Sequence, residues 1–239
     1  MKKLLLISFC FISLFIRCQH QPVDETEKTL VAYDNIPEGI QKLLKAYPGH
    51  FREVKENHII WKDGSKMPFD DNRKDKTFSQ LINEADLEDQ VMSMKYPRDK
   101  KFQIPAQKQD PGRVRYEPFF KKMYGNSPQE VKSKLTTIVW LPKTLNIKLE
   151  VTTVNDIHLR LQAISNKLDT MPHLHKYLKN PGGTFNWRNI AGTNRLSMHS
   201  FGMTIDLNVE YSDYWRWATK TEEGDGSRII EYKNRIPQK

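Results

Sequence analysis

Segments with helical spacing and segments with strand-like spacing follow one another irregularly along the 239 residues. The hydrophobic spacing predicts helices over 36–49, 77–94 and 156–171, a strand over 147–154, and two short strands around Asp63-Gly64. A parallel sheet would require a regular alternation of strands and crossover helices. We therefore predict an α+β fold, with a small, mainly antiparallel sheet, flanking helices and a mostly helical N-terminal extension.

Two helices are expected to bury a defined apolar face. In the segment 77–94 this face consists of Phe78, Leu81, Ile82 and Leu87. In the segment 156–171 it consists of Leu159, Leu161, Ile164 and Leu168.

The N-terminus differs from the rest of the chain. Lys2 and Lys3 precede an apolar run that is shorter than the about 20 residues needed to span a bilayer. This pattern is typical of a secretory signal over residues 1–18 and predicts export to the periplasm or cell envelope. Cys18 is a candidate lipid-bearing residue for membrane anchoring, although Arg17 stands where a small residue is expected.

The remaining chain divides into three predicted parts. Residues 19–33 are polar and acidic and suit a tether. Residues 34–143 form the N-terminal extension, and residues 144–239 form the core that carries the chemistry.

Cysteine and charge exclude several classes of protein. Both cysteines, Cys10 and Cys18, lie in the signal region, so the body has no disulfide framework and no cysteine-based metal site. The formal net charge is +9, but lysine and arginine are scattered and form no dense run. This distribution favours a solvated surface over a nucleic-acid groove, and we expect no nucleic-acid partner.

The stretch "RLSMHSFGMTIDLNV" (195–209) combines polar groups with an apolar alternation. The period of two over Met203–Val209 predicts a strand whose polar face carries Asp206. A bend at Gly202 would bring His199 back over that face. Imidazole and carboxylate are good Zn²⁺ ligands. For these two residues alone, however, the favoured interpretation is an ordinary strand after a loop, with a hydrogen-bonded His–Asp pair.

The spacing Ser197-x-His199-x-x-Gly202-x-x-x-Asp206 resembles the signature of the D-alanyl-D-alanine carboxypeptidase family of zinc metallopeptidases. Vancomycin-resistance-type carboxypeptidases and several phage endolysins are members of that family. The resemblance implies that His199 and Asp206 bind Zn²⁺ and that Ser197 helps to shape the substrate site. Thr204 departs from the family, which usually has alanine there.

The likeness continues upstream through "GGTFNWRNIAGTNRLSMHSFG" and is good from about Gly182 to Asn208. It implies that Arg188 faces the substrate carbonyl and stabilises the developing oxyanion. The likeness is weaker over 147–182.

The resemblance also implies a third zinc ligand, a histidine near the C-terminus that follows an acidic general base. No histidine follows Asp206. His173 and His175 are expected at the surface, Glu222-Glu223 in a polar loop and Glu231 on a strand-like segment. None has the spacing of the family, so the third ligand and the base stay unassigned.

Two explanations stay open. The chain is truncated, as the helix-like start at Pro237–Lys239 favours, or it is a short form that binds wall material without hydrolysis. The expected function is an exported zinc peptidase that hydrolyses D-Ala-type bonds of peptidoglycan stem peptides. The alternative is a catalytically inactive cell-wall-binding or scaffold protein of the same fold. Carboxypeptidase, endopeptidase and dipeptidase actions are not distinguished.

Overall fold

The computed structural model describes residues 36–95, 108–211, 213, 219–223, 226–231, 235 and 237. The predicted signal, both cysteines and the tether lie outside these residues. The described residues all fall in one unit of the chain, Ala32–Lys239. None of the described helices is long and apolar enough to cross a lipid bilayer.

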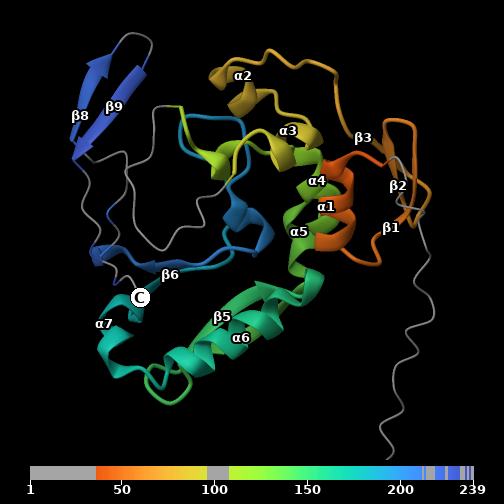
Figure 1. Cartoon of the computed structure of the whole chain (residues 1–239). Helices are drawn as coiled ribbons and strands as arrows, with labels where there is room; N and C mark the ends of the chain where they lie inside the picture. Colours follow the sequence, from red (N-terminus) through yellow and green to blue (C-terminus); the bar gives the residue numbers. More distant parts are fainter. Residues whose placement is uncertain are drawn as a thin grey trace, which may run out of the picture. The chain divides into compact units, whose positions relative to one another are not determined.

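The described chain starts with a helix and a three-stranded antiparallel sheet (Figure 1). Helix α1 is followed by strands β1, β2 and β3, which span Glu38–Ala46, Phe51–Lys55, His58–Trp61 and Lys66–Pro68. The predicted helix and the strands on either side of Asp63-Gly64 are confirmed. Strand β1 is an addition, which pairs with β2 in antiparallel register.

The single helix predicted over 77–94 is wrong, because the chain forms two helices there. They are α2 (Phe78–Asn83) and α3 (Leu87–Met92). The Asp86 side chain accepts a hydrogen bond from the backbone N–H of Asp89, at 2.7 Å, and so begins a new helix. A capping box of this kind ends the preceding helical register even where the apolar spacing continues.

The next helices include one that adds aromatic side chains to the core. They are η2 (Pro111–Arg113), α4 (Glu117–Tyr124) and α5 (Pro128–Lys132). Phe120 and Tyr124 of α4 contact Phe201, with ring centroids 5.8 Å and 5.9 Å apart. The turn that carries His199 is therefore anchored on the same hydrophobic core as the N-terminal helices.

A β-hairpin covered by one helix forms the second core cluster. Strands β4 (Leu135–Trp140) and β5 (Ile147–Thr152) pair in antiparallel register, and α6 (Ile157–Leu168) lies against them (Figure 1). The proposed boundary between residues 143 and 144 falls in the turn of this hairpin.

The predicted inward face of α6 is wrong in part. Leu161 and Leu168 pack against the hairpin cluster, but Leu159 and Ile164 are exposed. Ser165 is fully buried instead, because its hydroxyl accepts the backbone N–H of Leu141 at 2.7 Å. A hydrogen bond to the end of β4 thus rotates a polar residue inward.

The C-terminal half is made of short elements. They are η3 (Val154–Asp156), η4 (Pro172–Leu174), α7 (His175–Leu178), β6 (Pro181–Gly183), η5 (Met198–Phe201), β7 (Asp206–Asn208), η6 (Val209–Tyr211), β8 (Thr219–Glu223) and β9 (Gly226–Glu231). Glu222 and Glu223 lie in strand β8, so the loop predicted for them is wrong, whereas Glu231 ends a strand as expected.

The strand predicted over 203–209 is shorter in the structure, where β7 spans Asp206–Asn208. The predicted alternation of buried and exposed residues is wrong at its C-terminal end. Leu207 and Val209 are exposed, and Asn208 is buried. The Asn208 amide donates to the carbonyl of Lys176 at 2.8 Å and accepts the N–H of Glu210 at 3.2 Å. These two bonds hold Asn208 inward and start the turn of η6.

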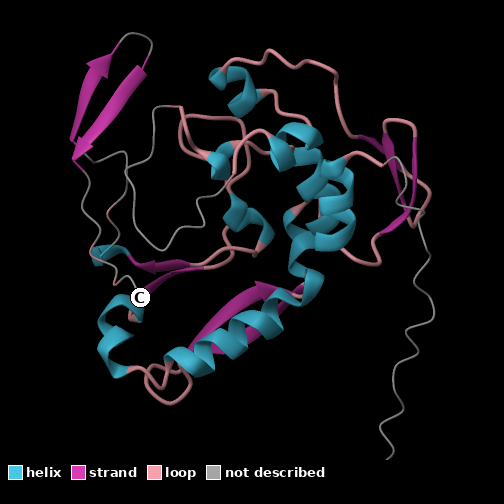
Figure 2. Ribbon diagram, viewed as in Figure 1, coloured by secondary structure: helices cyan, strands magenta, loops and turns pink. Residues whose placement is uncertain are grey.

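The described strands form one three-stranded and three two-stranded antiparallel sheets, interspersed with helices (Figure 2). The predicted α+β class is confirmed.

Candidate metal centre

His199 lies on the short turn η5, which is closed at both ends. The Ser197 hydroxyl accepts the backbone N–H of His199 at 3.4 Å. Gly202 ends the turn with φ +61°, and its N–H donates to the His199 carbonyl at 3.1 Å. A Cβ at residue 202 would lie 2.6 Å from Leu135 Cδ2, so the close approach requires glycine.

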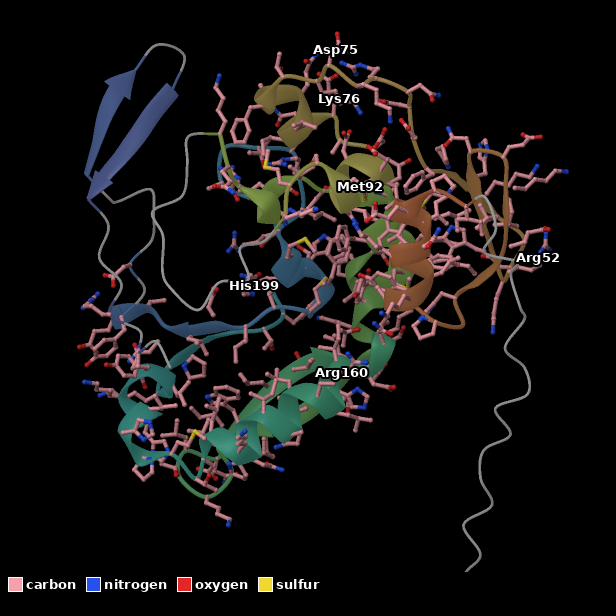
Figure 3. All side chains as sticks on the ribbon, in the orientation of Figure 1. Arg52, Asp75, Lys76, Met92, Arg160 and His199 are labelled. Carbon is pink, nitrogen blue, oxygen red and sulfur yellow. The ribbon has the colours of Figure 1, made fainter. Side chains whose placement is uncertain are left out.

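The imidazole of His199, which is labelled in Figure 3, lies between two hydrogen-bond acceptors. Its Nδ1 is 3.1 Å from the backbone carbonyl oxygen of Thr184, and its Nε2 is 3.3 Å from Asp206 Oδ1. A neutral imidazole has only one N–H. It can therefore satisfy one of these oxygens, and the other contact requires a second proton or a metal ion.

The burial of the two acceptors differs. Thr184 is buried, whereas the Asp206 side chain is 55% exposed. A buried carbonyl has no water to replace a lost donor, so the N–H belongs at Nδ1. That tautomer leaves the lone pair of Nε2 directed at the Asp206 carboxylate.

Strand pairing places Asp206 opposite the glycines of β6. Asp206 pairs with Gly183, and a Cβ at Gly182 would lie only 2.9 Å from Asp206 Cβ. The small residue at 182 thus leaves the space that the Asp206 side chain occupies.

The two donor atoms fit a zinc ion. Ligand atoms about 2.0–2.1 Å from one tetrahedral Zn²⁺ lie about 3.3 Å apart, and the observed separation of Nε2 and Oδ1 is 3.3 Å. Within the described part of the chain, no third His, Cys, Asp or Glu has its ligand atom grouped with this pair. The pair therefore offers two candidate ligand atoms, one fewer than the three protein ligands of a typical catalytic zinc.

The structure brings Ser197 and the backbone of Arg188 to the His199 turn. The N–H of Ser197 donates to the Arg188 carbonyl at 2.9 Å, and the Ser197 side chain is buried beneath His199. The Arg188 side chain is exposed, with one guanidinium N–H 3.4 Å from the carbonyl of Asn189. Its charge is available at the surface beside the turn.

Two residues at the site were not predicted. Thr184 supplies the carbonyl that faces His199, and the buried Ser200 hydroxyl accepts the Arg188 N–H at 3.0 Å. Neither side chain contacts the His199–Asp206 pair directly, so motif spacing gives little signal for these two residues. The glycine pair before Thr184 is the one sequence sign of a close backbone approach.

The other clustered acidic groups already hold a cation. Lys76, labelled in Figure 3, has a side chain only 1% exposed, with Nζ 2.7 Å from Asp71, 3.4 Å from Asp86 and 2.5 Å from Asp89. Burial alone would lower the pKa of Lys76, but the hydrogen bonds to Asp71 and Asp89 and the charge of Asp86 raise it instead. These carboxylates form an internal ion cluster.

The two histidines considered as substitutes lie elsewhere. His173 is exposed on η4, as expected. His175, at the start of α7, is half-buried, and its Nε2 has no hydrogen-bond partner. The surface position predicted for His175 is therefore wrong, because its side chain is half-buried and its Nε2 atom is enclosed.

Comparison with known proteins finds a similarity to one family over the C-terminal part of the chain. Residues 191–236 match the family model of the D-alanyl-D-alanine carboxypeptidases. No curated protein and no solved structure matches the chain significantly. The matched segment includes His199 and Asp206 and indicates, at family level, a peptidase of the carboxypeptidase type.

Proposed function

We propose that the protein is an exported, zinc-dependent peptidase that hydrolyses D-Ala-type bonds in the stem peptides of peptidoglycan. One observation carries the metal assignment. His199 Nε2 and Asp206 Oδ1 converge to 3.3 Å while Nδ1 faces a buried carbonyl. This arrangement directs a lone pair and a carboxylate at one point that a cation can occupy.

Each residue has a distinct role in this proposal. His199 and Asp206 hold the ion, and Ser197 fixes the turn beneath the imidazole. Zinc is a Lewis acid that polarises a carbonyl and acidifies water. The exposed guanidinium of Arg188 would stabilise the negative charge that develops on the scissile carbonyl oxygen.

The substrate class and location rest on different support. The family match over 191–236 favours peptides that end in D-alanine. The basic and apolar start of the chain favours export, which would bring the protein to the peptidoglycan, and Cys18 offers a site for a lipid anchor.

The test combines metal analysis with an isosteric substitution. We expect the wild-type protein to bind about one Zn²⁺ per chain and to release D-alanine from a synthetic stem peptide that ends in D-Ala-D-Ala. Asp206→Asn removes the charged ligand and should weaken zinc binding by more than about 100-fold, with loss of hydrolysis. Asp156→Asn, at an exposed aspartate without a capping bond, is the matched control.

Three outcomes are informative. Zinc binding and hydrolysis that survive Asp206→Asn would refute the site. Zinc binding without hydrolysis of stem peptides would support the inactive wall-binding alternative. A wild-type protein that binds no zinc would contradict the proposed function.

A further inference from the structure

We propose that Thr184 is the positioning residue of the metal centre, and that its hydroxyl holds the His199 imidazole in the tautomer that a metal requires. This inference rests on the proposed function, because it concerns the same pair of ligands. It assigns a role to a residue that contacts the ligand His199 through its backbone only.

Thr184 connects His199 to strand β5. Its hydroxyl donates to the backbone carbonyl of Glu150 at 2.6 Å, and its own carbonyl lies 3.1 Å from His199 Nδ1. Thr184 is buried, so water does not compete for either contact. Through these two contacts of Thr184, the position of strand β5 sets the orientation of the His199 imidazole.

The hydroxyl fixes the backbone at the point where Thr184 follows the end of a strand. Strand β6 ends at Gly183, which has φ +96° and so leaves the strand conformation immediately before Thr184. The side-chain bond to Glu150 then fixes where the Thr184 carbonyl points. A histidine that ligates a metal normally donates its other N–H to such an oxygen, which sets the tautomer and the ring orientation.

Strand β5 also supports the far side of the turn. The N–H of Thr152 donates to the Gly202 carbonyl at 3.0 Å, two residues along β5 from Glu150. The His199 turn is therefore tied to the same strand before and after the imidazole. β5 is held in register by six pairs with β4, which makes it a rigid reference for the site.

The experiment uses three variants of the full chain. Thr184→Val keeps the side-chain shape and removes the hydroxyl, whereas Thr184→Ser keeps the hydroxyl and should rescue binding. Thr153→Val is the control, because Thr153 makes a comparable hydroxyl bond, 2.9 Å to the carbonyl of Lys134. Zinc affinity is measured by competition with a chromophoric chelator, and folding is checked by thermal unfolding.

We expect Thr184→Val to bind zinc about 10- to 100-fold more weakly than wild type. Thr184→Ser and Thr153→Val should stay close to wild type. If Thr184→Val does not fold, Thr184→Ala takes its place. Zinc affinity equal to wild type in a folded variant without the hydroxyl would overturn the proposal and leave the proposed function intact.

A second measurement does not depend on zinc. The ¹⁵N chemical shifts of the His199 ring are recorded in the metal-free protein in alkaline buffer, because they distinguish the two ring nitrogens. We expect the Nδ1–H tautomer in wild type and a mixture of tautomers in Thr184→Val. A dominant Nε2–H tautomer in wild type would overturn the positioning role, whereas a wild type with the Nδ1–H tautomer that binds no zinc would contradict only the proposed function.

Discussion

Two polar clusters of this protein hold carboxylates in different ways. In the first, Asp71, Asp86 and Asp89 surround the buried ammonium group of Lys76. In the second, Asp206 faces His199, and no lysine or arginine of the described chain forms an ion pair with this carboxylate. The first cluster contains its own cation, while the second presents two electron-pair donors to each other.

The two clusters also differ in whether they can accept a further cation. Burial raises the pKa of Asp86, and the charge of Asp89 adds to this, while hydrogen bonds from the backbone and the charge of Lys76 oppose it. That cluster is closed by the chain itself. The His199–Asp206 pair is open to solvent on the Asp206 side and can take its positive charge from solution.

The largest effect is expected from removal of the internal cation. Lys76→Met leaves three carboxylates close together without a counter-charge and should lower the free energy of unfolding by about 3–5 kcal/mol. The loss should shrink at acidic pH, where Asp86, whose pKa is raised by burial, binds a proton. Urea unfolding at two pH values measures both. Lys74→Met, at an exposed lysine, is the control and should cost at most about 1 kcal/mol.

A smaller effect, on zinc affinity rather than on stability, is expected at the His199–Asp206 pair. Gly182→Ala places a Cβ 2.9 Å from Asp206 Cβ, so the aspartate has to move. Gly182 is exposed, and the change should leave the unfolding midpoint nearly unchanged. We expect zinc affinity to fall by about 10-fold, measured by chelator competition. Unchanged affinity would show that the present position of Asp206 is not required for binding.

The smallest effect is expected at the ion pair of Lys122 and Asp63, which is more exposed than the ion cluster around Lys76. Hydrogen bonds from Lys122 and then Ser65 lower the pKa of Asp63 below its usual value of 3.8. A lowered pKa gives stability that is present above about pH 4 and is lost as the pH falls through the native pKa. Asp63→Asn should therefore slightly flatten the acid side of a stability–pH curve. A curve as steep as that of wild type would show that the pair contributes nothing measurable.

The sequence predicted the approach of His199 to Asp206 better than it predicted which residues of the neighbouring elements are buried. His199 and Asp206 were expected to meet across a glycine bend, and their side chains lie 3.3 Å apart. Leu159 and Ile164 were expected to be buried, and both are exposed. Ser165 instead turns inward to bond the end of β4, and hydrophobic periodicity does not record such polar partners.

Local sequence also could not show which hydrogen bonds join residues that are far apart in the sequence. Thr184 is important through its carbonyl and through a bond to Glu150, a residue far away in sequence. The break between α2 and α3 could have been predicted from the sequence, because Asp86 and Asp89 have the spacing of a capping box. The apolar spacing across the break favoured one continuous helix instead.

By itself, the sequence determined the α+β class and the two candidate zinc ligands. The hydrophobic period, a property of short segments, gave the class. The resemblance of the motif from Ser197 to Asp206 to the carboxypeptidase family gave the ligands. Only the tertiary structure decided how the imidazole is oriented, since that depends on Thr184, Gly182 and strand β5 together. Orientation is set by contacts between distant segments, and these contacts exist only after the chain has folded.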